Sequence, residues 1–300
     1  MSRLPRLSLA AVPYFWTRET YLDFYRRVAE SAIDIVYLGE TVCSKRRALR
    51  FEDWIELAEL LSASGKEVVL STLTLIEAES ELKYLRRILQ HGEGLVEAND
   101  LAAVEVAHGL GRPFVAGSPV NIYNPRSLSL LQRQGMRRWC VPVELGRDDL
   151  GPLIDTAREL GVEVEYQVFG RMPLAWSARC FTARHHGLPK DDCRLVCQQH
   201  EQGLAVRSQE GEDFAQLNGI QTQSGRVLDL LSQWPSLVES GISVLRLMPL
   251  DAEDSLRVIE QTAQAMAAGS TPVLSLSRDY PRCDGYWSGA EGMRRTVEPA

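Results

Sequence analysis

The chain has 300 residues, of which 45% are hydrophobic and 24% charged, as is ordinary for a soluble globular protein. Its net charge of −7 argues against a general nucleic-acid-binding protein, because such proteins usually present a basic face. No apolar stretch is long enough to predict a membrane-spanning helix, and no small-residue cleavage site follows the apolar N-terminal run. We therefore expect a cytoplasmic protein, in which clustered cysteines indicate metal binding or catalysis rather than disulfides.

Eight short apolar runs are expected to form strands. Most are continuously apolar rather than alternating, as is typical of parallel strands covered on both faces. They are residues 7–13, 33–39, 67–73, 94–98, 113–117, 137–143, 162–170 and 243–249. Helical patterns fit between them, for example the apolar stripe of Trp54, Leu57 and Leu61, which Gly65 follows as a stop signal.

This alternation predicts an α/β fold, namely a (β/α)8 TIM-barrel-like fold, with a doubly wound open sheet as the alternative. The alternation of strands and helices is interrupted after the seventh strand. We interpret residues 171–230 as an insertion within a single barrel-like domain spanning residues 1–300. Two short strands, GLAVRSQ and FAQLNGI, are expected within the insertion, and an irregular tail is expected from Ser270 onward.

Four of the six cysteines are expected to meet at one site. Cys43 directly follows the second strand, and Cys180, Cys193 and Cys197 lie in the insertion after the seventh. Groups just past the carboxyl ends of parallel strands converge on one face of such a fold. Cys140 lies inside the sixth strand and is expected to be a small buried side chain.

The spacing of these four cysteines predicts a metal site but leaves its type open. Structural zinc usually takes closely spaced pairs of ligands, whereas here one cysteine stands alone and twelve residues separate Cys180 from Cys193. A cubane iron–sulfur cluster takes four cysteine thiolates at varied spacings. The pattern favours iron–sulfur, with zinc and chance clustering as alternatives. Cys283 is expected to be a bystander.

Polar residues near the strand ends are expected to form a pocket beside the metal, although some could instead cap helices. They are Glu40, Glu97, Asn99, Asn121, Asn124 and Glu144. No acid or base is assigned among them, so the catalytic residues are unknown. The basic residues that flank Cys43 and Cys180 could offset cluster charge, although a solvated surface is the simpler interpretation for each. His185 and His186 are expected to be an exposed pair.

Several segments together resemble a known family. They are YLGETVCSKRRA, VLSTLTLIEA, FVAGSPVNIYN, RQGMRRWCVPVELGRD, PLAWSARCFTAR, LPKDDC, LNGIQTQSG and the C-terminal CDGYW. In order and over nearly the whole chain, they look like the UbiV family of ubiquinone biosynthesis proteins, part of the wider group of collagenase-like, YhbU/YhbV-type peptidases. No protease constellation supports that historical name here.

The resemblance implies a [4Fe–4S] cluster held by Cys43, Cys180, Cys193 and Cys197. It also implies an iron–sulfur subunit of an anaerobic, O2-independent hydroxylase of hydrophobic ubiquinone precursors. The implied partners are a UbiU-like protein, in a heterodimer, and a lipid-carrier-like accessory protein, with prephenate as a candidate oxygen donor. Two alternatives stay open: a non-catalytic electron-transfer or stabilising partner, and an RNA-base hydroxylase like other members of the wider group.

Overall fold

Eight parallel strands close into a barrel in the computed structural model, which describes residues 4–92 and 94–295. The strands are β1 (Arg6–Leu9), β2 (Ile35–Leu38), β3 (Glu67–Ser71), β4 (Val96–Ala98), β5 (Phe114–Ala116), β6 (Met136–Cys140), β7 (Glu163–Trp176) and β11 (Val244–Leu247). Closure comes from β11, which pairs in parallel with both β1 and β7; Val244 lies opposite Arg6 on one side and Glu165 on the other. The barrel and all eight predicted strands are therefore confirmed.

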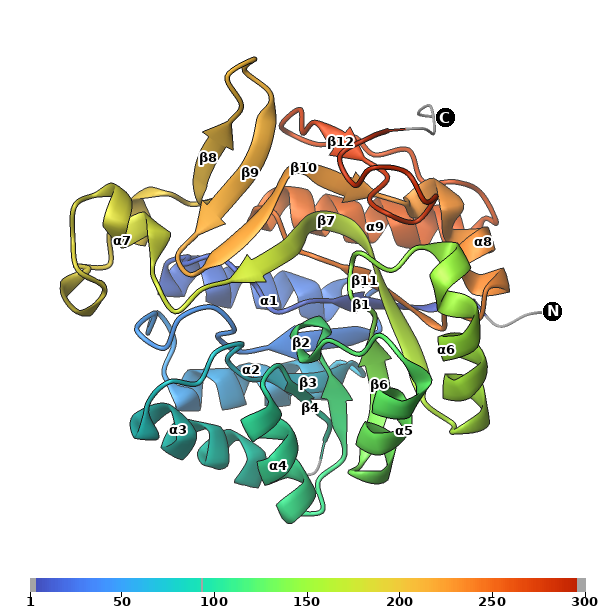
Figure 1. Cartoon of the computed structure of the whole chain (residues 1–300), viewed down its shortest axis with the longest axis horizontal. Coiled ribbons are helices and arrows are strands. Elements are labelled where there is room, and N and C mark those ends of the chain that lie inside the picture. Colours follow the sequence, from blue (N-terminus) through green and yellow to red (C-terminus); the bar gives the residue numbers. More distant parts are fainter. Residues whose placement is uncertain (1–3, 93, 296–300) are drawn as a thin grey trace.

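Helices follow the barrel strands and surround them (Figure 1). They are α1 (Arg18–Glu30), α2 (Phe51–Ala63), α3 (Glu79–Gln90), α4 (Leu101–Gly109), α5 (Pro125–Arg133), α6 (Arg147–Glu159), α8 (Trp234–Glu239) and α9 (Ala252–Ala267). In α2 the stripe of Trp54, Leu57 and Leu61 is buried as predicted, and the chain leaves the helix through Gly65 at φ +84°. Within the described residues no helix is both long and apolar enough to cross a membrane.

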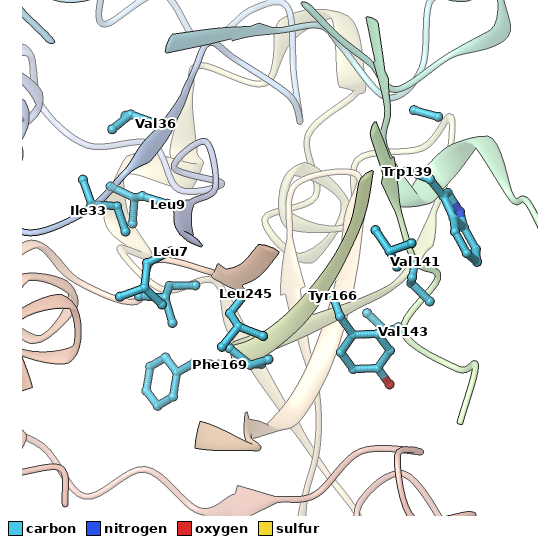
Figure 2. Close-up of a cluster of buried hydrophobic side chains, with 14 of the residues drawn as sticks. Leu7, Leu9, Ile33, Val36, Trp139, Val141, Val143, Tyr166, Phe169 and Leu245 are labelled. Atoms are coloured by element: carbon cyan, nitrogen blue, oxygen red, sulfur yellow. The ribbon is translucent and has the colours of Figure 1, made fainter. Parts of the chain in front are cut away.

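Side chains alternate between two layers along the barrel strands. Those that point outward, such as Leu7, Trp139 and Leu245, pack in the large hydrophobic core (Figure 2). Those that point inward include a small apolar group with Tyr37 and Val244, together with charged residues. This period of two is what a closed parallel barrel requires, since its interior is filled by alternate residues of each strand.

The segment after β7 extends the sheet beyond the barrel. Strand β7 continues past the predicted end at Gly170 to Trp176, and β10 (Gln221–Asp229) returns antiparallel to it. Between them lie α7 (Phe181–His185), two 3₁₀ turns (Lys190–Asp192 and Val196–Gln199), β8 (Leu204–Arg207) and β9 (Asp213–Asn218). In Figure 1 the β8–β9 hairpin projects above the barrel with α7 beside it.

The two short strands predicted in this region correspond to β8 and β9, whereas β10 was not predicted. Near the C-terminus, β12 (Arg282–Cys283) pairs with β10 in a region otherwise without long elements. The last part of the expected irregular tail, residues 296–300, lies outside the described residues.

Candidate functional site

A polar pocket opens at the mouth of the barrel, where the carboxyl ends of the strands meet. Its lining combines strand-end residues with residues of β7 and β10 beyond the barrel, including Thr41, Thr74, Glu97, Asn99, Cys140, Glu165, Gln167, Trp176, Gln221 and Arg246. An outer cavity of about 500 Å³ shares Thr74, Trp176 and several neighbours with it. The exposed Leu174 and Tyr123 line this outer cavity, so its rim is partly apolar.

Arg246 supplies the positive charge in this barrel-mouth pocket. Its guanidinium donates to Glu97 Oε1 at 2.6 Å and to Glu165 Oε1 at 3.1 Å, and lies 4.2 Å from the centre of the Tyr37 ring. Glu97 and Glu165 are 2% and 0% exposed, so the cation bridges two buried carboxylates. Such a bridge is stable only when each charge is paired and hydrogen-bonded, as these are.

Glu165 is held ionised by its neighbours. Burial alone would raise the pKa of this carboxyl group, but attraction to Arg246 and Arg138 and hydrogen bonds from Ser8 and Tyr37 lower the pKa below its ordinary value. Ser8 Oγ donates at 2.6 Å, and Tyr37 donates from its hydroxyl. Because both of its carboxylate oxygens already accept hydrogen bonds, Glu165 is better placed to fix the geometry of Arg246 than to move a proton.

Cys140 is buried in β6, as predicted from its position in an apolar strand. It lines the barrel-mouth pocket, and its Sγ lies 3.5 Å from Arg246 Nη1. Burial, followed by the nearby charge of Glu165, raises the pKa of this thiol well above its ordinary value. Among the described residues that line the pocket there is no histidine to act as a base, so the thiol is a poor nucleophile.

All four cysteines singled out in the sequence line a second, smaller pocket. Cys43 comes from the loop after β2, Cys180 immediately precedes α7, and Cys193 and Cys197 come from the adjoining turns. None is in a disulfide, and each side chain is partly exposed. The fold thus brings together thiols that are far apart in the chain.

Backbone contacts position the first two of these thiols. The Glu40 carboxylate accepts from the backbone N–H groups of Val42 at 2.8 Å and Cys43 at 3.0 Å, and so shapes the loop that presents Cys43. Cys180 Sγ accepts from the backbone N–H of Ala183 at 3.4 Å, at the first turn of α7. Burial raises the pKa of Cys43 and Cys197. The positive charge of Arg46 acts in the opposite direction and favours their thiolates.

Arg46 lies in the wall of the cysteine pocket and is 5% exposed, so a solvated surface is the wrong interpretation for this residue. Its guanidinium donates to the carbonyl oxygen of Pro13 and to Asn218 Oδ1, both at 2.8 Å. Asn218 in turn donates to Gln221 at 3.3 Å, and Gln221 lines the barrel-mouth pocket. Arg46 and this short chain of hydrogen bonds therefore connect the two pockets.

The kind of metal group that the cysteine pocket could hold depends on how its four sulfur atoms are spaced. Within residues 4–92 and 94–295, no group of three or more His, Cys, Asp or Glu side chains is arranged to hold a single metal ion. Four sulfur atoms around one zinc ion would lie about 3.8 Å apart, because zinc–sulfur bonds of about 2.3 Å point to the corners of a tetrahedron.

The other polar residues predicted to face the site are divided among several places. Glu97 and Asn99 line the barrel-mouth pocket, and Asn121 and Glu144 line the outer cavity. Glu40 supports the Cys43 loop instead. Asn124 caps α5 by accepting from Ser127 N at 2.9 Å, which is the alternative role considered for such residues.

The two adjacent histidines belong to a larger group. His186 Nε2 lies 2.8 Å from His200 Nε2, and the ring of His185 lies 5.2 Å from that of His186. The hydrogen bond is exposed, which agrees with the expectation for His185 and His186. Cys283 is fully buried in β12 and is not part of the cysteine pocket.

Sequence reasoning missed the charged residues inside the barrel. Arg138, Glu165 and Arg246 lie in strands that were predicted only as apolar runs. Arg138 is 1% exposed at its side chain and pairs with Glu67 at 2.7 Å and Glu163 at 2.8 Å. The available signal was a charged residue within a predicted buried strand, because such a residue must find a partner inside the protein.

Most of the chain matches one protein family. The model of peptidase family U32 matches residues 22–256 of this chain. That range includes the barrel strands from β2 to β11 and all four cysteines of the second pocket.

Solved structures resemble the chain at low identity. The U32 peptidase Mk0906 is 15% identical with a TM-score of 0.44, over 83% of this chain and 94% of that one. An uncharacterized B. cereus protein is 11% identical with a TM-score of 0.46, over 85% of this chain and 64% of that one. Ribulose-1,5-bisphosphate carboxylase/oxygenase from Pyrococcus horikoshii is 12% identical with a TM-score of 0.49, over 90% and 61%. The chain thus spans less than two thirds of the last two proteins, and we draw no functional conclusion from similarity at this level.

Proposed function

This chain belongs to peptidase family U32, and we propose that within this family it is the iron–sulfur subunit of an O2-independent hydroxylase of ubiquinone precursors. We further propose that it works as a heterodimer with a UbiU-like protein, as its resemblance to the UbiV family implies. The observation that carries the proposal is the pocket lined by Cys43, Cys180, Cys193 and Cys197.

The residues of this pocket fit a [4Fe–4S] cluster. Four free thiols supply the four ligands that a cubane takes, and in a cluster each thiolate binds a different iron, so the sulfurs need not converge on one atom. The buried guanidinium of Arg46 and the backbone N–H of Ala183 provide positive charge and a donor beside the sulfurs. When bound, such a cluster would supply one-electron redox chemistry.

The barrel-mouth pocket, together with the outer cavity of about 500 Å³ that adjoins it, is the proposed site for the organic reactants. The NH2 groups of Asn99 and Gln167 already donate to protein oxygens, so their amide oxygens are the groups left for a reactant. Arg246 provides a fixed positive charge that is already balanced by Glu97 and Glu165. The apolar rim of the outer cavity at Leu174 suits a hydrophobic ubiquinone precursor. Without O2, the oxygen atom must come from water or from an organic donor, for which prephenate is the candidate.

Proteolysis is less well supported. The Cys140 thiol has a raised pKa and no histidine among the described lining residues of its pocket, so it lacks the activation that a nucleophilic cysteine needs. The polar barrel-mouth pocket is connected through Arg46 to the cysteine pocket, which is the proposed site of a redox-active cluster. This combination favours a hydroxylase over a protease.

The test is product formation by the assembled, anaerobically purified heterodimer, measured by mass spectrometry. It is supplied with a quinone precursor and prephenate and, in parallel reactions, with RNA and with a peptide. We expect the wild-type protein to form hydroxylated product. Cys43→Ala should abolish this product, whereas Cys283→Ala should retain it, because Cys283 lies outside both pockets. We also expect Gln167→Ala to lower product formation at least tenfold while leaving bound iron unchanged. Full activity in that variant would instead assign an electron-transfer role to this chain, and hydroxylated RNA or cleaved peptide as the only product would overturn the proposal.

A further inference from the structure

We propose that a third cavity, between α2 and α3, binds a small molecule that combines a planar aromatic ring with an anionic group. The cavity has a volume of about 380 Å³, which falls in the size range of small-molecule sites. It lies beside the Cys43 loop and has only Arg46 in common with the cysteine pocket. This inference does not depend on the proposed hydroxylase function.

The walls of the cavity are aromatic and apolar. Trp54 and Leu73 are buried beneath it, and Phe51 and Tyr84 form a half-buried pair whose ring centres lie 6.1 Å apart in an edge-to-face arrangement. Aromatic walls of this kind favour a flat ring, because offset and edge-to-face contacts add to the area that is buried.

Exposed guanidinium groups surround these walls. Arg47, Arg50 and Arg87 all line the cavity, from the Cys43 loop, the start of α2 and the body of α3. The guanidinium of Arg87 lies 4.0 Å from the centre of the Phe51 ring, so a cation and an aromatic face already adjoin each other. An anionic group on a flat ring could contact both at once.

The carboxylates that line the same cavity are already engaged. Glu40 accepts from backbone N–H groups of the Cys43 loop, and Glu81 accepts from Ser44 Oγ at 2.6 Å and from the backbone N–H of Glu77 at 2.7 Å. Glu52 pairs with Arg87 at 2.5 Å. Glu52 engages only Nη2 of Arg87, and neither Arg47 nor Arg50 forms an ion pair within the described residues. All three guanidiniums therefore have donors left for a ligand, and their charge selects an anion.

Isothermal titration of the full-length protein, purified anaerobically, tests the proposal with three probes: 2-naphthoate, its neutral counterpart 2-naphthol, and the non-aromatic anion cyclohexanecarboxylate. We expect saturable binding of 2-naphthoate, at least tenfold weaker binding of the other two, and a tenfold loss of 2-naphthoate affinity in both Arg50→Gln and Arg87→Gln. Arg86→Gln is the matched control, because Arg86 is the exposed neighbour of Arg87 on α3 but does not line the cavity.

Three results would overturn the proposal. They are a dissociation constant for 2-naphthoate weaker than about 1 mM, equal affinity for cyclohexanecarboxylate, or affinity that Arg50→Gln and Arg87→Gln leave unchanged. Because Arg50, Arg86 and Arg87 are exposed, the three variants are expected to fold. Thermal unfolding curves that coincide with that of the wild type would verify this.

Discussion

The guanidinium of Arg46 donates a hydrogen bond to Asn218 Oδ1 at 2.8 Å, although the two residues lie 172 positions apart in the chain. This contact joins the loop after β2 to the end of β9, and so joins the barrel to the segment that carries three of the four cysteines. It also lies between the cysteine pocket and the barrel-mouth pocket. The relative placement of the two pockets therefore depends on a buried polar contact as well as on apolar packing.

Replacing Arg46 with Met keeps an unbranched apolar side chain but removes the guanidinium that donates to Asn218 and Pro13. We expect Arg46→Met to lower the free energy of unfolding by about 2 kcal/mol, because a buried hydrogen bond to a charged group is lost and its acceptor is left unsatisfied. Arg47→Met, at the exposed neighbouring position, should change it by less than about 0.5 kcal/mol. Urea unfolding measures both, and equal stability of the two variants would contradict the role given to Arg46.

Glu165→Gln should destabilise the protein in a way that depends on pH. At pH 7 we expect a loss of about 3 kcal/mol, because Arg246 and Arg138 lose a buried countercharge. The folded-state pKa of Glu165 is lowered, so its stabilising contribution is present above its ordinary pKa of 4.5 and is lost as the pH falls through the folded-state value. The difference between wild type and variant should therefore shrink below about pH 4.5.

Denaturant unfolding at pH 7, 5 and 4 measures this difference. Glu105→Gln, at an exposed position on α4, serves as the control and should match wild type at each pH. A difference for Glu165→Gln that stays constant down to pH 4 would show that its carboxylate is not stabilised by the two arginines.

Arg246→Met should show the opposite dependence on pH. Without the guanidinium, the burial of Glu165 is less compensated, and the pKa of this carboxyl group rises in the folded state. A raised pKa gives stability that is present at low pH and lost as the pH rises, so the deficit of Arg246→Met relative to wild type should be larger at pH 8 than at pH 5. A deficit that grows toward acid pH would contradict the bridge between Glu97 and Glu165.

Gly39 precedes Glu40 and the Cys43 loop at a position where only glycine fits. Its φ is +144°, and an added Cβ would lie 2.6 Å from the carbonyl oxygen of Ser71. We expect Gly39→Ala to cost about 1–3 kcal/mol or more and to disturb the loop. Gly109→Ala, at the end of α4 with open space around it, should be neutral or stabilising by about 0.5 kcal/mol. Thermal unfolding distinguishes the two variants. An unchanged melting temperature for Gly39→Ala would contradict the claim that only glycine fits at this position.

The barrel was predictable because its signal is local and repeated. Each strand is a short apolar run, and helical patterns such as that of α2 separate the runs. The continuation of β7 to Trp176 was not predictable in the same way, since it depends on pairing with β10, whose polar sequence QTQSGR does not resemble a buried strand. Tertiary pairing there overrides local preference.

The candidate site was predictable only in part for the same reason. Cysteines are rare, so their positions after β2 and β7 pointed to a common site. The partners of Arg246 could not be identified, because Glu97 and Glu165 become its neighbours only once the barrel closes. Arg46 could not be distinguished from Arg47 by sequence, since burial by Asn218 and the segment after β7 is a property of the fold.

The most direct test of the account is the iron and sulfide content of the anaerobically purified protein, with its absorbance spectrum. We predict a brown protein with about four irons and four sulfides per chain. Each of Cys43→Ala, Cys180→Ala, Cys193→Ala and Cys197→Ala should bleach it, whereas Cys140→Ala and Cys283→Ala should not. A colourless protein holding one zinc ion, or iron that survives all four substitutions, would contradict the assignment of these cysteines as ligands of an iron–sulfur cluster.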